Sequence, residues 1–115
     1  MKVGYHDNNF PSGLTPFILE ARQKGLELKR IYTPSQIEKN IEVLIINPLS
    51  GVEKRDYWQG IREMVKKTGE RTRVILITPF DYQKEFVEQQ IGTPENLEYL
   101  TYQRTYKLKD LLPNN

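Results

Sequence analysis

Two uninterrupted aliphatic runs constrain what this chain can fold into. Residues 43–46 read Val-Leu-Ile-Ile and stop at Asn47, and residues 74–77 read Val-Ile-Leu-Ile and stop at Thr78. Neither run alternates with polar residues, which predicts two strands that are buried on both faces. Strands of this kind belong to a parallel sheet that helices cover on both sides.

The segment between these runs predicts the helix that connects two parallel strands. Its apolar residues recur at helical spacing, and they are Tyr57, Ile61, Met64 and Val65. Gly69 is placed to end the helix. A strand, a helix and a second strand in this order form a right-handed βαβ unit. The rest of the chain must then supply the remaining helices and the edges of the sheet.

Further strand and helix patterns alternate along the chain. Strands are predicted over residues 2–5, 26–32 and 97–102, and the last two are polar enough for sheet edges. The remaining helical patterns have clear start or stop signals. They are a helix from Thr15 to Gly25, a short helix over 33–40, a helix from Asp81 to Gly92 and a tail helix over 106–112.

Five predicted strands therefore alternate with five predicted helices. This pattern predicts an α/β fold, a three-layer doubly wound sandwich around a five-stranded parallel sheet. The flavodoxin-like order 2-1-3-4-5 fits best, because the third and fourth strands are the most apolar. The chain has 115 residues, so we expect residues 1–115 to form one domain. A site in such a sheet lies at the carboxyl ends of the strands, where the sequence places His6, Asp7, Asn47, Thr78 and Tyr102.

Composition removes several classes of function. Without cysteine, the chain has no disulfide framework, thiol nucleophile or thiolate metal site. No apolar run is long enough to span a membrane, and the first residues lack a signal-peptide pattern. We therefore expect a cytoplasmic protein without a membrane partner.

The charge of the chain points to no particular ligand. A net charge of +2 is too small to imply nucleic-acid binding by itself. The basic cluster of Lys66, Lys67, Arg71 and Arg73 lies at a helix end, where cations are favoured in any protein. A solvated helix end is our preferred interpretation, and a phosphate-binding patch is the alternative.

The polar residues after the first strand also allow two interpretations. His6 could be a general base, but no second catalytic group accompanies it, so we expect an exposed loop histidine. Asp7 could hold a cation, but an Asx turn with the asparagines that follow it is the simpler expectation. No Walker-type or GxGxxG glycine pattern is present. We expect neither a cofactor nor a metal.

Over residues 42–112 the sequence resembles a response-regulator receiver domain. Residues 43–48 are similar to the strand that ends in the phospho-accepting aspartate. Thr78 stands where the family has its switch serine or threonine, and Tyr99 where it has its switch aromatic. The resemblance implies a flavodoxin-like, receiver-like fold and a role in signal transduction.

Three chemical positions of that family are changed in this chain. Asn47 replaces the phospho-acceptor, Tyr102 replaces the lysine that contacts the phosphoryl group, and the acidic pair has become His6 and Asp7. An amide cannot form an acyl phosphate, and Mg²⁺ needs more carboxylate oxygens than Asp7 alone supplies. The resemblance therefore implies a degenerate, or pseudo-, receiver without aspartyl phosphorylation.

We therefore expect a non-catalytic signalling or regulatory domain that binds a protein partner or itself. The family implies an interaction face made by the fourth helix, fifth strand and fifth helix. Aromatic and arginine side chains suit such an interface, although tyrosines half-buried over a helix are an equal alternative. The candidate residues of this face are Phe86, Tyr99, Tyr102, Arg104 and Tyr106.

Two other classes of function stay open. The first is a small flavodoxin-like enzyme or a nucleotide- or small-ligand-binding domain that uses Asp7, Asn47 and Thr78 at the strand ends. The second is a nucleic-acid-associated accessory protein that uses the basic residues. A bound ligand would favour the first, and a salt-dependent shift of labelled DNA would favour the second.

Overall fold

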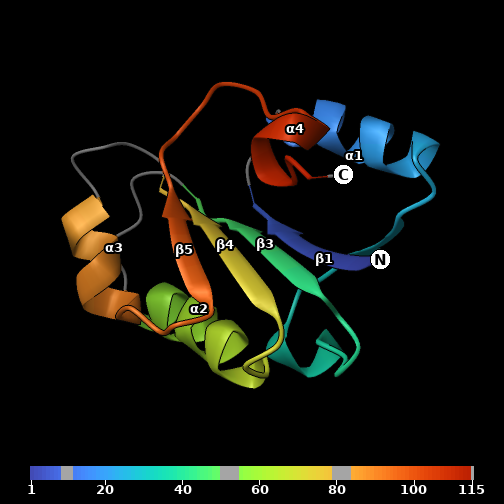
Figure 1. Cartoon of the computed structure of the whole chain (residues 1–115). Helices are drawn as coiled ribbons and strands as arrows, with labels where there is room; N and C mark the ends of the chain where they lie inside the picture. Colours follow the sequence, from blue (N-terminus) through green and yellow to red (C-terminus); the bar gives the residue numbers. More distant parts are fainter. Residues whose placement is uncertain (9–11, 50–54, 79–83, 115) are drawn as a thin grey trace.

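A five-stranded, all-parallel sheet forms the centre of the molecule (Figure 1). The computed structural model describes residues 1–8, 12–49, 55–78 and 84–114. The strand order β2-β1-β3-β4-β5 confirms the predicted α/β class and the order 2-1-3-4-5, which is that of flavodoxin-like folds. The strands are β1 (Lys2–Asp7), β2 (Glu27–Arg30), β3 (Val43–Asn47), β4 (Arg73–Ile77) and β5 (Leu97–Leu100).

Helices lie against both faces of the sheet. Figure 1 shows α1 (Thr15–Gln23) and α4 (Leu108–Leu111) on one face, and α2 (Arg55–Lys67) and α3 (Lys84–Ile91) on the other. The described residues contain these four α-helices rather than the five that the sequence pattern predicts. The start of the helix predicted from Asp81 lies outside the described residues.

The fifth predicted helix, over residues 33–40, is instead the single 3₁₀ turn η1 (Pro34–Gln36). The Gln36 side chain folds back, and its Oε1 accepts the backbone N–H of Thr33 at 3.0 Å, as in a capping box. Ile37 is already extended, with φ −77° and ψ 116°. A turn at residues 39–40 follows, and both Ile37 and Ile41 are buried in the core.

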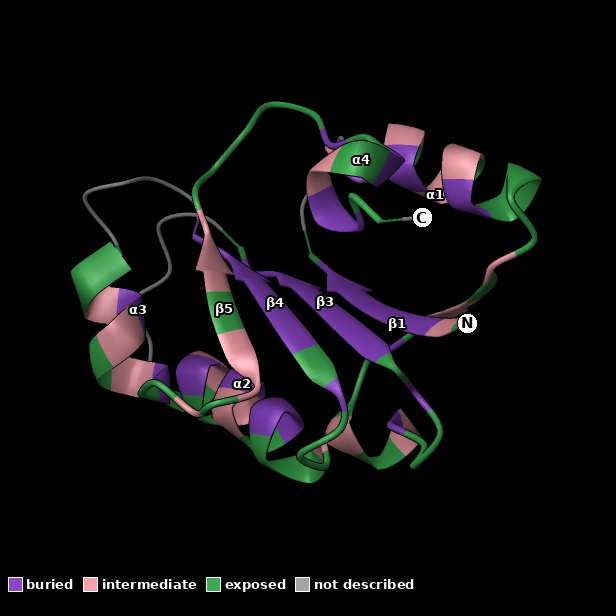
Figure 2. Ribbon diagram, viewed as in Figure 1, coloured by how far each residue is buried: buried purple, intermediate pink, exposed green. Residues whose placement is uncertain are grey.

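The strands bury apolar residues on both faces, as the two uninterrupted runs predict (Figure 2). Alternate side chains of β3 belong to different cores: Ile45 packs on the face of α1 and α4, and Leu44 and Ile46 pack on the face of α2 and α3. Phe17, Leu108 and Leu111 cover the first core, and Trp58, Ile61 and Val87 cover the second.

β2 and β5 form the two edges of the sheet, as predicted from their polar residues. Both strands are shorter than the predicted ranges 26–32 and 97–102. Across the β4–β5 pair, the exposed side chains of Arg73 and Glu98 form an ion pair of 2.6 Å. No helix within 1–8, 12–49, 55–78 or 84–114 has the length and apolar character needed to cross a membrane.

Gly13 allows the chain after β5 to close onto the start of α1. The backbone N–H of Tyr106 donates to the Gly13 carbonyl at 2.8 Å. A Cβ atom at residue 13 would lie 2.7 Å from the carbonyl oxygen of Arg104. This contact is with backbone, so it cannot be relieved by a side-chain rotation.

We predict that Gly13→Ala destabilises the fold by about 1–3 kcal/mol, because the added methyl group forces the two backbones apart. Gly60→Ala is the matched control: Gly60 lies inside α2, and its Cβ would meet nothing within 4 Å. The control should be stabilised by about 0.5–1 kcal/mol. Urea unfolding measures both values, and equal stability of the two variants would contradict the close approach at Gly13.

Candidate functional site

The polar ends of β1 and β3 meet at the centre of the sheet. Asp7 and Asn47 are direct neighbours in the parallel register, and both are buried, at 4% and 6% exposure. The Asn47 amide nitrogen donates to Asp7 Oδ1 at 3.1 Å. The structure therefore brings together two of the residues that the sequence places at the candidate site.

Asp7 receives a hydrogen bond on each carboxylate oxygen. In addition to the Asn47 amide on Oδ1, the Ser12 hydroxyl donates to Oδ2. Ser12 Oγ also accepts the backbone N–H of Leu14 at 3.0 Å, and Arg30 donates to the backbone carbonyl of Asp7 at 3.0 Å. Asp7 is the last residue of β1, and the predicted Asx turn involves Asn9, which lies outside the described residues.

His6 is also buried, at 6% exposure, so the expectation of an exposed loop histidine is wrong. It lies in β1 because the strand runs two residues beyond the predicted range 2–5, pairing His6 with Ile46 of β3. Its Nδ1 lies 2.7 Å from the Ile31 carbonyl oxygen, and its Nε2 lies 3.0 Å from the Asn8 amide nitrogen. A carbonyl oxygen only accepts, so Nδ1 carries the proton and Nε2 accepts from Asn8.

Tyr57 connects this network to α2, although its hydroxyl has no role in the sequence-based prediction. The Tyr57 hydroxyl oxygen accepts the Asn8 amide at 3.1 Å and the backbone N–H of Leu49 at 2.7 Å. One hydroxyl group thus joins the end of β1, the residues after β3 and the start of α2. Tyr57 could have been identified from the sequence, because its hydroxyl is a polar group on an otherwise apolar helix face.

Thr78, at 1% exposure, lies one residue beyond β4. Its hydroxyl donates to the Leu100 carbonyl of β5 at 3.2 Å, and its backbone N–H donates to the same oxygen at 2.9 Å. Thr78 therefore joins the ends of β4 and β5.

The candidate interaction residues differ in how much surface they offer. Tyr102 is 43% exposed and Arg104 is exposed, and both lie in the segment between β5 and α4. Phe86 is half-buried, with its ring edge-on to Trp58 at 5.8 Å between ring centroids. Tyr99 is half-buried and donates to the Gly92 carbonyl at 2.6 Å, and burial raises the pKa of its hydroxyl to about 12.

Tyr106 cannot contribute a contact surface, because it is only 1% exposed. Its ring belongs to the core under α1 and α4, and its hydroxyl oxygen accepts the backbone N–H of Gln103 at 2.7 Å. Burial raises the pKa of this hydroxyl to about 12. The prediction that Tyr106 belongs to the interaction face is therefore corrected: it anchors the segment that carries Tyr102 and Arg104. The helix predicted over 106–112 covers only Leu108–Leu111.

The residues at the strand ends do not fit a Mg²⁺ ion of the kind that receiver domains hold. Such an ion needs several oxygen ligands, and Asp7 is the one acidic side chain among the described residues that end or directly follow the strands. Within the described part of the chain, no three His, Cys, Asp or Glu residues are grouped so that they could hold a metal. The remaining polar groups of this network bind one another.

No protein-family model matches this chain, and a search of curated proteins also finds no match. The function must therefore be argued from the residues and their contacts.

We predict that the folded protein loses stability as the pH falls below about 6.5, the usual pKa of histidine. Burial, opposed by the Ile31 carbonyl and Asp7, lowers the pKa of His6. The unfolded chain therefore binds a proton at a higher pH than the folded chain does. The contribution of His6 to the free energy of unfolding is complete above the unfolded pKa. It decreases as the pH falls below that value, by at most about 1.4 kcal/mol per pH unit. Urea unfolding between neutral and mildly acidic pH measures the slope.

His6→Gln is the control for this pH dependence, because glutamine does not titrate. Its stability should vary less with pH over the same interval than that of the parent protein. An identical slope in the parent and in His6→Gln would show that another group titrates.

Proposed function

We propose that this chain is a receiver-like regulatory domain with a three-layer architecture, which acts through protein–protein contacts without aspartyl phosphorylation. The observation that carries this proposal is the hydrogen bond from the Asn47 amide to Asp7 Oδ1 at 3.1 Å. It joins the two strand ends at which the receiver family would have its phospho-acceptor and its acidic pair. Pseudo-receiver character is thus supported by a contact as well as by residue identity.

The bond contributes to the stability of the buried carboxylate of Asp7. A buried carboxylate is costly unless donors satisfy its oxygens. Asn47 and Ser12 supply these donors to Asp7. Since the amide nitrogen of Asn47 points to Asp7, residue 47 supplies a donor where a receiver has a nucleophilic oxygen. This pair favours a constitutive structural state over a phosphorylation switch.

The hydrogen bonds of His6 argue against its use as a general base. A general base needs a lone pair that can reach a substrate proton. Nδ1 of His6 is bonded to Ile31, and Nε2 accepts from Asn8. Both nitrogens therefore serve the fold.

The proposed interaction face surrounds the β5 edge, between α3 and α4 (Figure 1). Tyr102 and Arg104 provide its exposed side chains, and Tyr99 and Phe86 support it from half-buried positions. Aromatic and arginine residues are enriched among the anchors of protein interfaces. A protein partner or a second copy of the chain would bind there.

A small-ligand-binding domain is the second candidate. The Asn8 side chain is exposed and lies between His6 and Tyr57, at the strand ends where doubly wound folds bind ligands. A ligand that contacts Asn8 and Tyr57 would support this candidate.

We predict that treatment with acetyl phosphate and Mg²⁺ adds no phosphate to the parent protein, because residue 47 has no carboxylate. Intact-mass spectrometry measures this directly. We also expect millimolar Mg²⁺ to leave the melting temperature unchanged, since any ligand that selects the folded state would raise it. An added phosphate, or a clear rise that Asp7→Ala abolishes, would contradict the proposal.

The Asn47→Asp variant makes this test sharper. It replaces a donor by a second buried carboxylate beside Asp7, which should cost about 2–4 kcal/mol through repulsion and a lost hydrogen bond. Mg²⁺ should then raise the melting temperature of this variant only. Asn40→Asp, the same change at an exposed position, should behave as the parent.

We predict that Tyr102→Ala combined with Arg104→Ala weakens self-association or partner capture while the fold survives. Interface anchors of these types cost about 2 kcal/mol or more when truncated, roughly a thirtyfold loss of affinity. Sedimentation velocity measures self-association, and pull-down from a cell extract measures partner capture. Circular dichroism verifies folding.

The matched control removes the same residue types from α1 and from the end of β2, the edge strand opposite β5. Tyr32 is 61% exposed just beyond β2, and Arg22 is exposed in α1. Tyr32→Ala with Arg22→Ala should retain every interaction of the parent. If the Tyr102 and Arg104 double variant also retains them, the proposed face is wrong.

A further inference from the structure

A hollow of about 500 Å³ lies at the amino-terminal end of the sheet, away from the Asp7–Asn47 pair. The chain that leads into β3 and the turn that joins α2 to β4 form its walls. Its size is within the range of pockets that hold small molecules. The charged residues of its lining are Glu38, Lys39, Lys67, Glu70 and Arg71.

Three cations reach this hollow from three different segments. Lys39 precedes β3, Lys67 ends α2 and Arg71 lies in the turn before β4. All three side chains are exposed, and none forms an ion pair with another described residue. The negative end of the α2 dipole accounts for Lys67 alone. Lys39 and Arg71 lie outside α2, and they add to the positive charge around the hollow.

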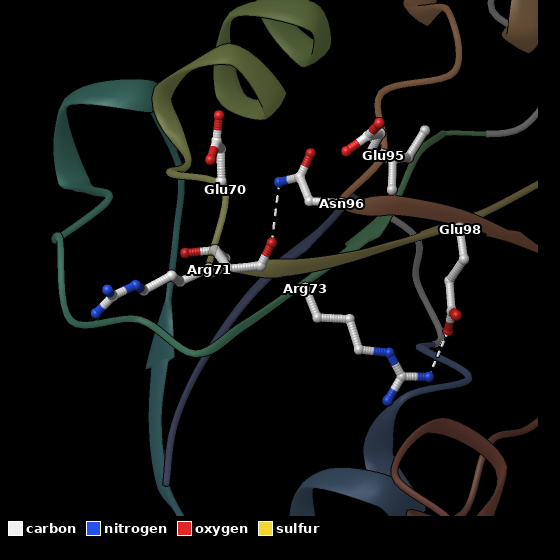
Figure 3. Close-up of a pocket in the computed structure, with 8 residues that line it drawn as sticks. Glu70, Arg71, Arg73, Glu95, Asn96 and Glu98 are labelled. Carbon is white, nitrogen blue, oxygen red and sulfur yellow. Dashed lines mark hydrogen bonds and ion pairs between the residues drawn. The ribbon is translucent and has the colours of Figure 1, made fainter.

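The nearby carboxylates do not balance these cations. Glu38 is bonded to both Lys2 and Lys29, and these bonds lower its pKa to about 2. Figure 3 shows Glu70 and Arg71 pointing apart: the Glu70 carboxylate lies toward the end of α2, and the Arg71 guanidinium lies toward the chain that enters β3. The hollow thus retains an excess of positive charge.

The turn that carries Arg71 is held in place by Asn96. The Asn96 amide nitrogen donates to Thr68 Oγ1 at 3.1 Å, to the Gly69 carbonyl at 3.3 Å and to the Thr72 carbonyl at 2.9 Å. Figure 3 shows Asn96 beside this turn, with a dashed bond to it. The Thr72 hydroxyl in turn donates to the Ile41 carbonyl at 2.8 Å. A wall that is ordered in advance lowers the entropic cost of binding.

We propose that this hollow binds the phosphate group of a small phosphorylated molecule through Lys39, Lys67 and Arg71. The planar guanidinium of Arg71 can donate two parallel hydrogen bonds to a phosphate, and the two ammonium groups add charge. The three cations surround one hollow instead of following a track along the surface. A nucleic-acid backbone, whose charges repeat along a line, is the poorer fit.

The proposal is tested by titrating the isotope-labelled protein with inorganic pyrophosphate at constant ionic strength. Amide signals of Lys39 and of residues 67–72 should shift and saturate. Lys67→Ala with Arg71→Ala should weaken the affinity at least about tenfold, since two charge-assisted contacts are lost. Arg22→Ala with Lys24→Ala removes two exposed charges at the end of α1, and it should change the affinity less than about twofold.

Three outcomes would overturn the proposal. The first is a titration without saturation at millimolar pyrophosphate. The second is an equal loss of affinity in the two double variants, which would indicate a general effect of net charge. The third is tighter binding of a single-stranded DNA oligonucleotide at the same residues, which would assign the patch to a polyanion. None of these measurements depends on the β5 face or on the Asp7–Asn47 pair.

Discussion

The burial of β3 and β4 on both faces is the constraint on which the rest of this structure depends. Leu44 and Ile46 pack on one side of the sheet and Ile45 on the other, so helices must cover both sides. Polar groups are then excluded from the middle of the central strands. They gather where these strands begin and end, and any binding chemistry must be found at the two ends of the sheet or along its edges.

The two ends of the sheet differ in how their polar groups are satisfied. At the carboxyl end, Asp7 accepts hydrogen bonds from Asn47 and Ser12. His6 bonds to the Ile31 carbonyl and to the Asn8 amide. These buried polar atoms therefore have partners within the protein. At the amino end, Lys39, Lys67 and Arg71 remain exposed around a hollow. The polar groups of the first end therefore serve the fold, whereas the second end presents positive charge at the surface.

The sequence predicts the sheet well because its signals are local. Uninterrupted apolar runs specify β3 and β4, and polar edge strands specify the order. The errors fall where the partners of a residue are distant in sequence. His6 and Asp7 look like loop residues, yet Ile31 and Asn47, which lie 25 and 40 positions away, stabilise them inside the structure. Tyr106 looks like an interface residue, but its anchor is Gly13, more than ninety positions earlier. No periodicity could have revealed these contacts.

The Asp7–Asn47 pair shows how a neighbouring amide stabilises a buried carboxylate. With an aspartate at position 47, two carboxylates would adjoin in a buried site, and the folded state would need a cation or a proton to offset their repulsion. Asparagine has nearly the same shape, but its amide turns this repulsion into a hydrogen bond. The same hydrogen bond ties the end of β1 to the end of β3 at the centre of the sheet.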